Sequence, residues 1–180
     1  MNTPTAMEPW IETSEGNKFW FTTDDADGIT VTDIAASLSK MCRFTGHCKR
    51  FYSVAEHSVH VSRLLPEHLA LAGLLHDASE AYLADIASPV KQLLPDYKRI
   101  EEKVMAKIAK AFDLPIGFDK DPEIKKADWS QLKSEAYHLL PSKGEGWFFP
   151  KGVLFGNTPG GLDPESAQRL FLETYNRITR

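Results

Sequence analysis

An apolar segment that runs directly into ionisable side chains constrains this chain more than any other feature. Leu69–Leu75 is almost entirely apolar, and His76, Asp77 and Glu80 follow it at once. A helix that is apolar on all sides lies in a protein interior. A carboxylate buried there without a partner costs on the order of several kcal/mol. The segment therefore predicts a buried helix whose charged groups need a counter-charge, which a metal ion would supply.

The spacing of these groups sets how they could share an ion. His76 and Glu80 are four residues apart, so they lie on one face of a continuous helix. Asp77 is turned by about 100° from His76, so the two can share an ion only in the sector between them. The alternative, from this dipeptide alone, is an ordinary buried helix with one hydrogen-bonded His–Asp pair.

Length and composition exclude several classes of protein. A chain of 180 residues predicts one domain. The net charge of −4 argues against partners such as nucleic acid or an anionic membrane. No apolar run approaches the roughly 20 residues of a membrane span, and the N-terminus does not resemble a signal peptide. Two cysteines make no disulfide framework, so we expect a cytoplasmic protein.

The N-terminal third contains signals for a small hairpin and a helix. Residues 1–18 are polar and are expected to form an irregular lead-in. Phe19–Thr23 and Ile29–Thr32 are rich in β-formers and flank a polar turn, which predicts a β-hairpin. Asp33 can then cap a helix that ends near Gly46.

A second histidine precedes His76 on a helix of its own. Ser53 and Glu56 form a capping box, so a helix begins there. His57 lies on the apolar face of this helix, whereas His60 is turned away from it. His76 follows His57 after 19 residues and one short turn. Two successive antiparallel helices would bring both imidazoles within reach of one ion.

The C-terminal half adds helices and one further carboxylate. Tyr97–Phe112 is strongly amphipathic and predicts a packing helix. Asp121-Pro122 caps another helix, on which Asp128 lies among the inward-facing residues. Pro141–Gly161 is expected to form a loop or short hairpin, either over the site or as a surface flap. A final helix is expected over residues 163–178.

Four inward-facing groups thus stand in chain order. They are two imidazoles and two carboxylates: His57, His76, Asp77 and Asp128. This mixture suits a divalent transition metal ion, and each residue is expected on a rigid helix. Coordination positions left open would hold water and a substrate oxygen.

The order of these ligands resembles that of the HD-domain metal-dependent phosphohydrolases. Further stretches resemble the 5′-deoxynucleotidase branch of that family, which includes small bacterial, prophage and phage proteins. They are Arg43-Phe44, VAEHS at Val54–Ser58, LLHDASEAYLADIASPVK at Leu74–Lys91, and IKKADWSQLKSE at Ile124–Glu135. The resemblance implies a single all-α HD-domain helical bundle with a core over residues 33–140. Residues 1–32 would form the lead-in and hairpin, and residues 141–180 the loop and final helix.

The resemblance also implies a role for each matching residue. The four ligands would hold the metal. Glu80 would orient or deprotonate the attacking water, or protonate the leaving oxygen. Arg43 would contact the phosphate, and Phe44 would pack on the nucleoside where the nucleotidases commonly carry a tryptophan. Asp85 would bind the sugar hydroxyl or assist catalysis, and Lys91 would contact the phosphate.

The histidine count limits the metal content. Dinuclear HD enzymes carry extra histidines between the HD pair and the last Asp, and none lies between Asp77 and Asp128. We therefore expect one divalent ion, of Co, Mn, Zn, Ni or Fe. The predicted reaction is hydrolysis of a nucleoside 5′-monophosphate, in the 2′-deoxy form, to nucleoside and phosphate. The partner is then a small-molecule nucleotide, and the resemblance allows a homo-oligomer.

Three alternatives remain at this point. A dNTP triphosphohydrolase could use the same mononuclear site, with extra phosphates bound by Lys49, Arg50 or Lys91. The second alternative is a non-catalytic, metal-binding regulatory domain, in which Glu80, Arg43 and Asp85 would have no function. A zinc site at Cys42, His47 and Cys48 has a spacing that resembles no common finger. His47 could instead touch the substrate.

Overall fold

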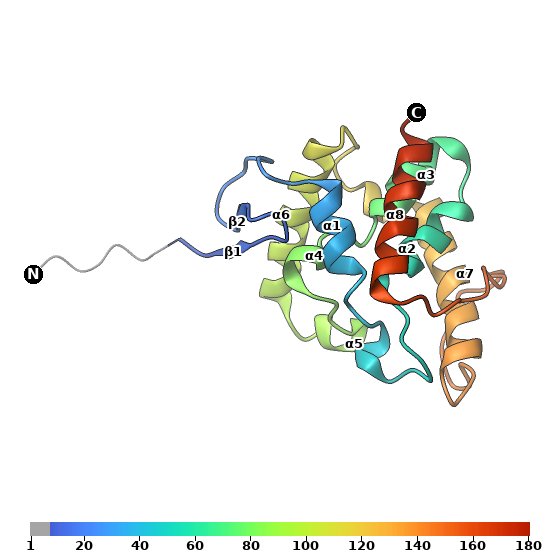
Figure 1. The fold of residues 1–180 in the computed structure, drawn as a ribbon. Coiled ribbons are helices and arrows are strands. Elements are labelled where there is room, and N and C mark those ends of the chain that lie inside the picture. Colours follow the sequence, from blue (N-terminus) through green and yellow to red (C-terminus); the bar gives the residue numbers. More distant parts are fainter. Residues whose placement is uncertain (1–7) are drawn as a thin grey trace, which may run out of the picture.

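The structure is a computed structural model that describes residues 8–180. It is mostly helical, with a two-stranded N-terminal hairpin and a C-terminal helix, as the sequence predicts (Figure 1). The elements are β1 (Trp10–Glu12), β2 (Lys18–Trp20), α1 (Val31–Leu38), η1 (Phe44–Gly46), α2 (Val54–Arg63), α3 (Glu67–Leu75), α4 (Glu80–Leu83), α5 (Ser88–Lys91), α6 (Pro95–Ala111), η2 (Phe118–Lys120), α7 (Pro122–Leu139) and α8 (Pro164–Ile178).

The hairpin forms earlier in the chain than predicted. β1 and β2 pair antiparallel, with Trp10 opposite Trp20. The tight turn between them contains Gly16, which adopts a φ of +80° and donates its N–H to the carbonyl of Thr13. Part of the predicted lead-in over residues 1–18 is therefore a strand and a turn, and residues 1–7 lie outside the described part. The predicted second strand, Ile29–Thr32, instead leads into α1.

The cap of α1 also differs from the prediction. Thr30 is the N-cap, since its hydroxyl accepts the N–H of Asp33 at 3.0 Å. Asp33 lies in the first turn, where its carboxylate accepts Ser14 Oγ at 2.6 Å and the N–H of Glu15 at 2.8 Å. The carboxylate therefore joins the hairpin turn to α1, a long-range role that the local capping pattern does not indicate.

The helix α1 ends sooner than predicted. It stops at Leu38, whereas Gly46 belongs to the short 3₁₀ turn η1. Between them, Cys42 forms an isolated bridge with Ser53, and the N–H of Arg43 donates to the carbonyl of Tyr52 at 2.9 Å. These bonds pull the chain into an extended path beside the start of α2.

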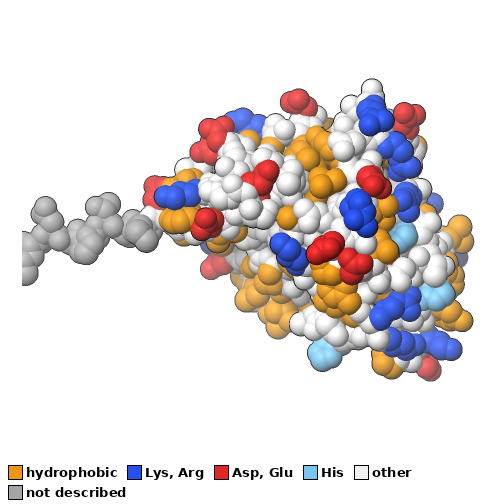
Figure 2. Space-filling view, viewed as in Figure 1, with side chains coloured by type: hydrophobic (Ala, Val, Ile, Leu, Met, Phe, Trp, Pro, Cys, Tyr) orange, Lys and Arg blue, Asp and Glu red, His pale blue; other side chains and the backbone are white. Residues whose placement is uncertain are grey.

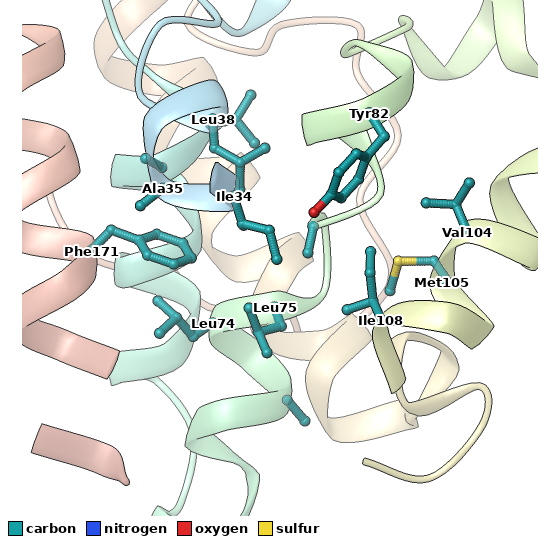
Figure 3. Packing of buried hydrophobic residues seen from close by; sticks show 14 of the residues in the cluster. Ile34, Ala35, Leu38, Leu74, Leu75, Tyr82, Val104, Met105, Ile108 and Phe171 are labelled. Carbon is teal, nitrogen blue, oxygen red and sulfur yellow. The ribbon is translucent and has the colours of Figure 1, made fainter. Parts of the chain in front are cut away.

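The core lies where α1, α3, α4, α6 and α8 meet. Figure 3 shows side chains from these helices that point into one interior, among them Ile34, Leu75, Ile108 and Phe171. All four are fully buried, and each contributes roughly 1.5–3 kcal/mol to the free energy of unfolding. This core holds α3 in place, and α3 ends at the candidate site.

A glycine allows α2 and α3 to approach closely. A Cβ atom added at Gly73 would lie 2.2 Å from Leu65 Cδ1 and 3.3 Å from Ser62 Cα. The two helices run one after the other across the short connection at Pro66, as the histidine spacing predicts. The close approach brings the end of α3 beside the middle of α2.

The buried helix does not continue through His76 as predicted. α3 ends at Leu75. In the turns that follow, backbone N–H groups donate to the carbonyl three residues earlier, as Glu80 does to Asp77 at 3.0 Å. The His76 side chain bonds the carbonyl of Gly73 at 2.9 Å, which favours a tighter end to the helix. His76 and Glu80 therefore do not share a face of one continuous helix.

Later elements follow the predictions more closely. Asp121 caps α7, whose bounds include Asp128, and Asp163 caps α8. The segment 141–161 contains no strand or helix and folds back beside α7 (Figure 1). There the N–H of Gly156 donates to the carbonyl of Ser130 at 2.9 Å. Within residues 8–180, no helix has the length and apolarity needed to cross a membrane.

Candidate metal centre

The four predicted ligands converge on one point. His57 comes from α2, His76 and Asp77 from the end of α3, and Asp128 from α7. His57 Nε2 lies 3.3 Å from His76 Nε2, 3.3 Å from Asp128 Oδ1 and 3.6 Å from Asp77 Oδ2. His76 Nε2 is 3.2 Å from Asp77 Oδ2 and 3.9 Å from Asp128 Oδ1. One ion could therefore contact His57, His76 and Asp128, and Asp77 lies beside the two imidazoles.

In the described part of the chain, one group of side chains meets the spacing of a metal site. The ligand atoms of His57, His76 and Asp128 all lie within 4.8 Å of one another. Both imidazoles are buried, and the two aspartates are partly exposed. The centre thus has buried nitrogen ligands and an open, carboxylate-lined side.

Hydrogen bonds at the far ring nitrogens orient both histidines in the way that a metal site requires. His57 Nδ1 lies 2.7 Å from Glu135 Oε1, and His76 Nδ1 lies 2.9 Å from the carbonyl of Gly73. Both partners only accept, so each Nδ1 carries the proton. The two Nε2 lone pairs then face each other and Asp128, and only a cation or an additional proton satisfies such an arrangement. Metal-bound histidines are oriented in this way.

Glu135 is a site residue to which the sequence analysis assigned no role. It is fully buried and binds three groups: His57, the Nε of Arg43 at 3.0 Å and the hydroxyl of Tyr52 at 2.8 Å. A signal was present in the sequence, because Glu135 follows Asp128 by seven residues, which is two turns along the same helix face.

The electrostatics of the centre reflect this crowding of carboxylates. Burial and the charge of Arg43 act to lower the pKa of His57, but Glu135 and Asp128 prevail and raise that pKa to about 9. Burial acts to raise the pKa of Asp77, but the two imidazoles and Arg43 hold it well below its usual range. The centre thus attracts positive charge at the point where the ligand atoms meet.

Arg43, the predicted phosphate contact, lies at the edge of the centre. Its guanidinium bonds Glu135 through Nε and approaches Asp77 Oδ2 to 3.7 Å through a terminal nitrogen. The side chain is 12% exposed, so it is mostly buried beside the aspartate. The predicted partner Phe44 follows it at the start of η1, with its ring 5.6 Å from the guanidinium carbon.

The other predicted site residues form a second group after the ligands. Glu80 is buried, and its Oε1 accepts Lys91 Nζ at 3.2 Å. Lys91 also donates to Glu101 at 2.7 Å, so two carboxylates hold it. Burial, followed by the charges of Asp77 and Asp85, raises the pKa of Glu80 well above its usual range. Burial also raises the pKa of Asp85, with Asp77 adding to the effect.

Among the described residues, Cys42, His47 and Cys48 do not form a group with the spacing of a metal site. Cys42 Sγ lies 3.6 Å from Cys48 Sγ. Burial and the neighbouring Cys42 thiol raise the pKa of Cys48 to about 11, which favours the thiol form. His47 is exposed beyond η1, and His60 faces Glu56 at 3.6 Å.

Comparison with known proteins places the chain among relatives of two kinds. It is 40% identical to the uncharacterized protein YfdR of Escherichia coli K12 over 174 residues, which cover 94% of this chain and 96% of YfdR. It is 36% identical over 123 residues to the uncharacterized protein RCAP_rcc00048 of Rhodobacter capsulatus, covering 62% and 63% of the two chains. Over 43 residues, 22% of each chain, it is 49% identical to a 5′-deoxynucleotidase of Vibrio atlanticus.

No protein-family model matches the chain. The match to YfdR, however, extends over nearly the full length of both proteins. The chain therefore belongs to the same protein family as YfdR.

Proposed function

We propose that the protein is a metal-dependent phosphohydrolase of the HD-domain type, which hydrolyses 2′-deoxynucleoside 5′-monophosphates to nucleoside and phosphate. One observation carries the proposal. Two Nε2 lone pairs and two aspartates converge directly beside the Arg43 guanidinium, which lies 3.7 Å from Asp77. The similarity of a short segment to a 5′-deoxynucleotidase supports the same reaction class. One divalent ion of Co, Mn, Zn, Ni or Fe fits the donor set.

The metal and Arg43 would have different roles in such a reaction. When bound, the metal lowers the pKa of a water molecule and polarises a phosphoryl oxygen. Arg43 places fixed positive charge where the phosphoryl group gathers negative charge in the transition state. Because Glu135 already fixes Nε, the terminal nitrogens of Arg43 are preorganised to contact the phosphate.

Glu80 is suited to transfer a proton. Its Oε2 atom is buried and has no hydrogen-bond partner among the described residues. Burial and the charges of Asp77 and Asp85 raise its pKa well above its usual range, which favours the protonated form. A protonated carboxyl group can donate to the oxygen of the leaving nucleoside. Lys91 keeps the other oxygen, Oε1, in place.

The basic residues favour a monophosphate over a triphosphate. Arg50 donates to the carbonyl of Pro159 at 2.8 Å, and Lys91 is held by Glu80 and Glu101. Two of the three side chains that could bind extra phosphates are therefore already engaged within the protein.

Product analysis tests the proposal directly. The metal-loaded protein is incubated with dAMP, AMP, dATP and dGTP, and nucleoside, phosphate and triphosphate are resolved. We expect phosphate and deoxyadenosine from dAMP, with slower turnover of AMP. Turnover of dATP without turnover of dAMP would move the assignment to a triphosphohydrolase.

The Asp128→Asn variant is the control for this assay, because it removes one carboxylate ligand at nearly constant volume. We expect it to lose both metal and turnover. A wild-type protein that binds one metal ion but releases no product from any of the four nucleotides would contradict the proposed activity.

A further inference from the structure

Four aromatic rings from three parts of the chain form a continuous row. The rings belong to Phe44 of η1, Trp147 and Phe149 of the segment after α7, and Trp129 of α7. The ring centroids of Phe44 and Trp147 are 6.1 Å apart, those of Trp147 and Phe149 6.4 Å, and those of Phe149 and Trp129 6.3 Å. Each distance is within the range of favourable aromatic pairs.

Each end of the row is next in the chain to a residue of the candidate metal centre. Phe44 directly follows Arg43, whose guanidinium lies beside Asp77. At the other end, Trp129 directly follows Asp128. The Phe44 end therefore lies beside the candidate phosphate contact, with the ring 5.6 Å from the Arg43 guanidinium carbon.

The backbone at both sides of the row is arranged to place these rings. Phe44 and Thr45 both adopt a left-handed backbone, with φ of 58° and 54°, which side chains with a Cβ rarely occupy. Gly144, at a φ of +79°, lies close to α7 and to the Phe149 ring, since a Cβ there would lie 3.3 Å from Ala136 Cβ and 3.5 Å from Phe149 Cε2. Strained conformations of this kind cluster at functional sites.

The row differs from an ordinary core cluster in its exposure. Trp147 is 42% exposed even though it packs between Phe44 and Phe149. On the face drawn in Figure 2, hydrophobic side chains reach the surface along the lower and right-hand edges, the side on which Figure 1 places α7. A large ring that is held in place but accessible to solvent can stack on a flat ligand.

We infer that this row is a nucleobase-binding platform, with Trp147 as its main contact. The inference rests on the proposed function and names the part of the substrate that the metal centre does not touch. A nucleotide whose phosphate meets Arg43 would extend its base along the neighbouring rings. Stacking uses the π-face that every base offers, so the platform accepts different bases.

The test compares a substrate that has a base with one that lacks it. The variant is Trp147→Leu, and the substrates are dAMP and 2-deoxyribose 5-phosphate. We expect the KM for dAMP to rise about tenfold, while the KM for 2-deoxyribose 5-phosphate stays unchanged. Trp147→Phe should restore most of the affinity for dAMP, because it keeps a stacking ring.

Phe148→Leu is the matched control. Phe148 is the next residue in the same segment, is 79% exposed, and belongs to none of the three ring pairs of the row. We expect this variant to keep both KM values. Equal rises of both KM values in Trp147→Leu, at an unchanged melting temperature, would overturn the inference.

A binding measurement separates this inference from the proposed reaction. Deoxyadenosine, which has a base and no phosphate, should quench tryptophan fluorescence in the wild type. Measured by equilibrium dialysis, its Kd should be about tenfold higher for Trp147→Leu than for the wild type. A protein that hydrolyses no nucleotide but shows this loss would refute the proposed function and keep the platform. Equal Kd values for the wild type and Trp147→Leu would refute the platform alone.

Discussion

At the scale of single residues, one buried carboxylate organises the candidate centre. Glu135 accepts hydrogen bonds from His57, Arg43 and Tyr52, so it orients both a candidate ligand and the candidate phosphate contact. Burial acts to raise the pKa of Glu135, but Arg43 and His57 prevail and keep the carboxyl ionised. Its charge thus balances a buried guanidinium and fixes the proton on His57 Nδ1.

Replacing this carboxylate should weaken metal binding without emptying the site of ligands. In Glu135→Gln we expect the metal Kd to rise about 10- to 100-fold, as is usual when the hydrogen-bond partner of a ligand is lost. Competition with a chromophoric chelator measures this Kd. Glu123→Gln, an exposed acidic residue on the same helix, is the control. An unchanged metal Kd in Glu135→Gln would contradict the positioning role.

Arg43 should not be replaceable by lysine. The planar guanidinium bonds Glu135 with Nε and still presents its terminal nitrogens, whereas an ammonium group cannot do both in this geometry. We expect Arg43→Lys to lower kcat/KM for dAMP about 10- to 100-fold, with metal content unchanged. Arg63→Lys, at the end of α2, is the control. Steady-state kinetics and metal analysis of the same samples measure both quantities. Full activity in Arg43→Lys would contradict the proposed phosphate contact of Arg43.

At the scale of elements, the segment after α7 is fastened to two helices. Gln131 of α7 exchanges two hydrogen bonds with the backbone of Asn157, at 2.9 and 3.2 Å. Glu56 of α2 then accepts the N–H groups of Gly160, Gly161 and Leu162. A Cβ at Gly156 would lie only 2.9 Å from Gln131 Cα, so this segment packs tightly on α7. These contacts hold Trp147 and Phe149 between fixed points.

The contacts of Glu56 predict a dependence of stability on pH. Burial acts to raise the pKa of Glu56, but the bonds from His60 and from three backbone N–H groups prevail and lower it. A lowered folded-state pKa stabilises the protein fully above the ordinary value of 4.5, and this contribution is lost as the pH falls through the folded-state value.

We therefore expect Glu56→Gln to destabilise the protein most at neutral pH, by roughly 2 kcal/mol. The difference from the wild type should shrink as the pH falls below about 4.5. Urea unfolding at pH 7 and pH 4 measures both values, and Glu67→Gln on α3 is the control. Equal differences at the two pH values would contradict this linkage.

At the scale of the whole molecule, the candidate centre connects parts of the fold that are distant in the chain. Its ligands come from α2, the end of α3 and α7. The two imidazole Nε2 atoms and the carboxylates of the two aspartates approach one another to 3.2 to 3.9 Å. A bound ion would join the three segments through its ligand bonds, so metal binding and folding should be coupled.

Metal removal should accordingly lower the melting temperature. At a free metal concentration 100 times the Kd, binding adds about 2.7 kcal/mol to the free energy of unfolding. For a chain of this size, that corresponds to a rise in Tm of roughly 5–10 °C. Calorimetry with metal and with a chelator measures the shift. Asp77→Asn should lose most of it, whereas the exposed Asp96→Asn should keep it. A shift of equal size in both variants would place the metal elsewhere.

The sequence by itself determined the helices whose signals are local. The caps at Ser53, Asp121 and Asp163 were predicted, because each accepts N–H groups only two or three residues away. The amphipathic pattern of 97–112 likewise predicted α6 within a few residues. The four candidate ligands were chosen from such patterns, since a helix face follows from spacing alone.

Only the tertiary structure decided the features that depend on distant partners. Asp33 is not the predicted N-cap, because its carboxylate accepts hydrogen bonds from the hairpin turn, 18 and 19 residues earlier. Glu135 gained its role from His57, 78 residues away, and the aromatic row joins η1 to the segment after α7. Local periodicity records which side of a helix faces inward, but the identity of a buried group's partner depends on how the helices pack.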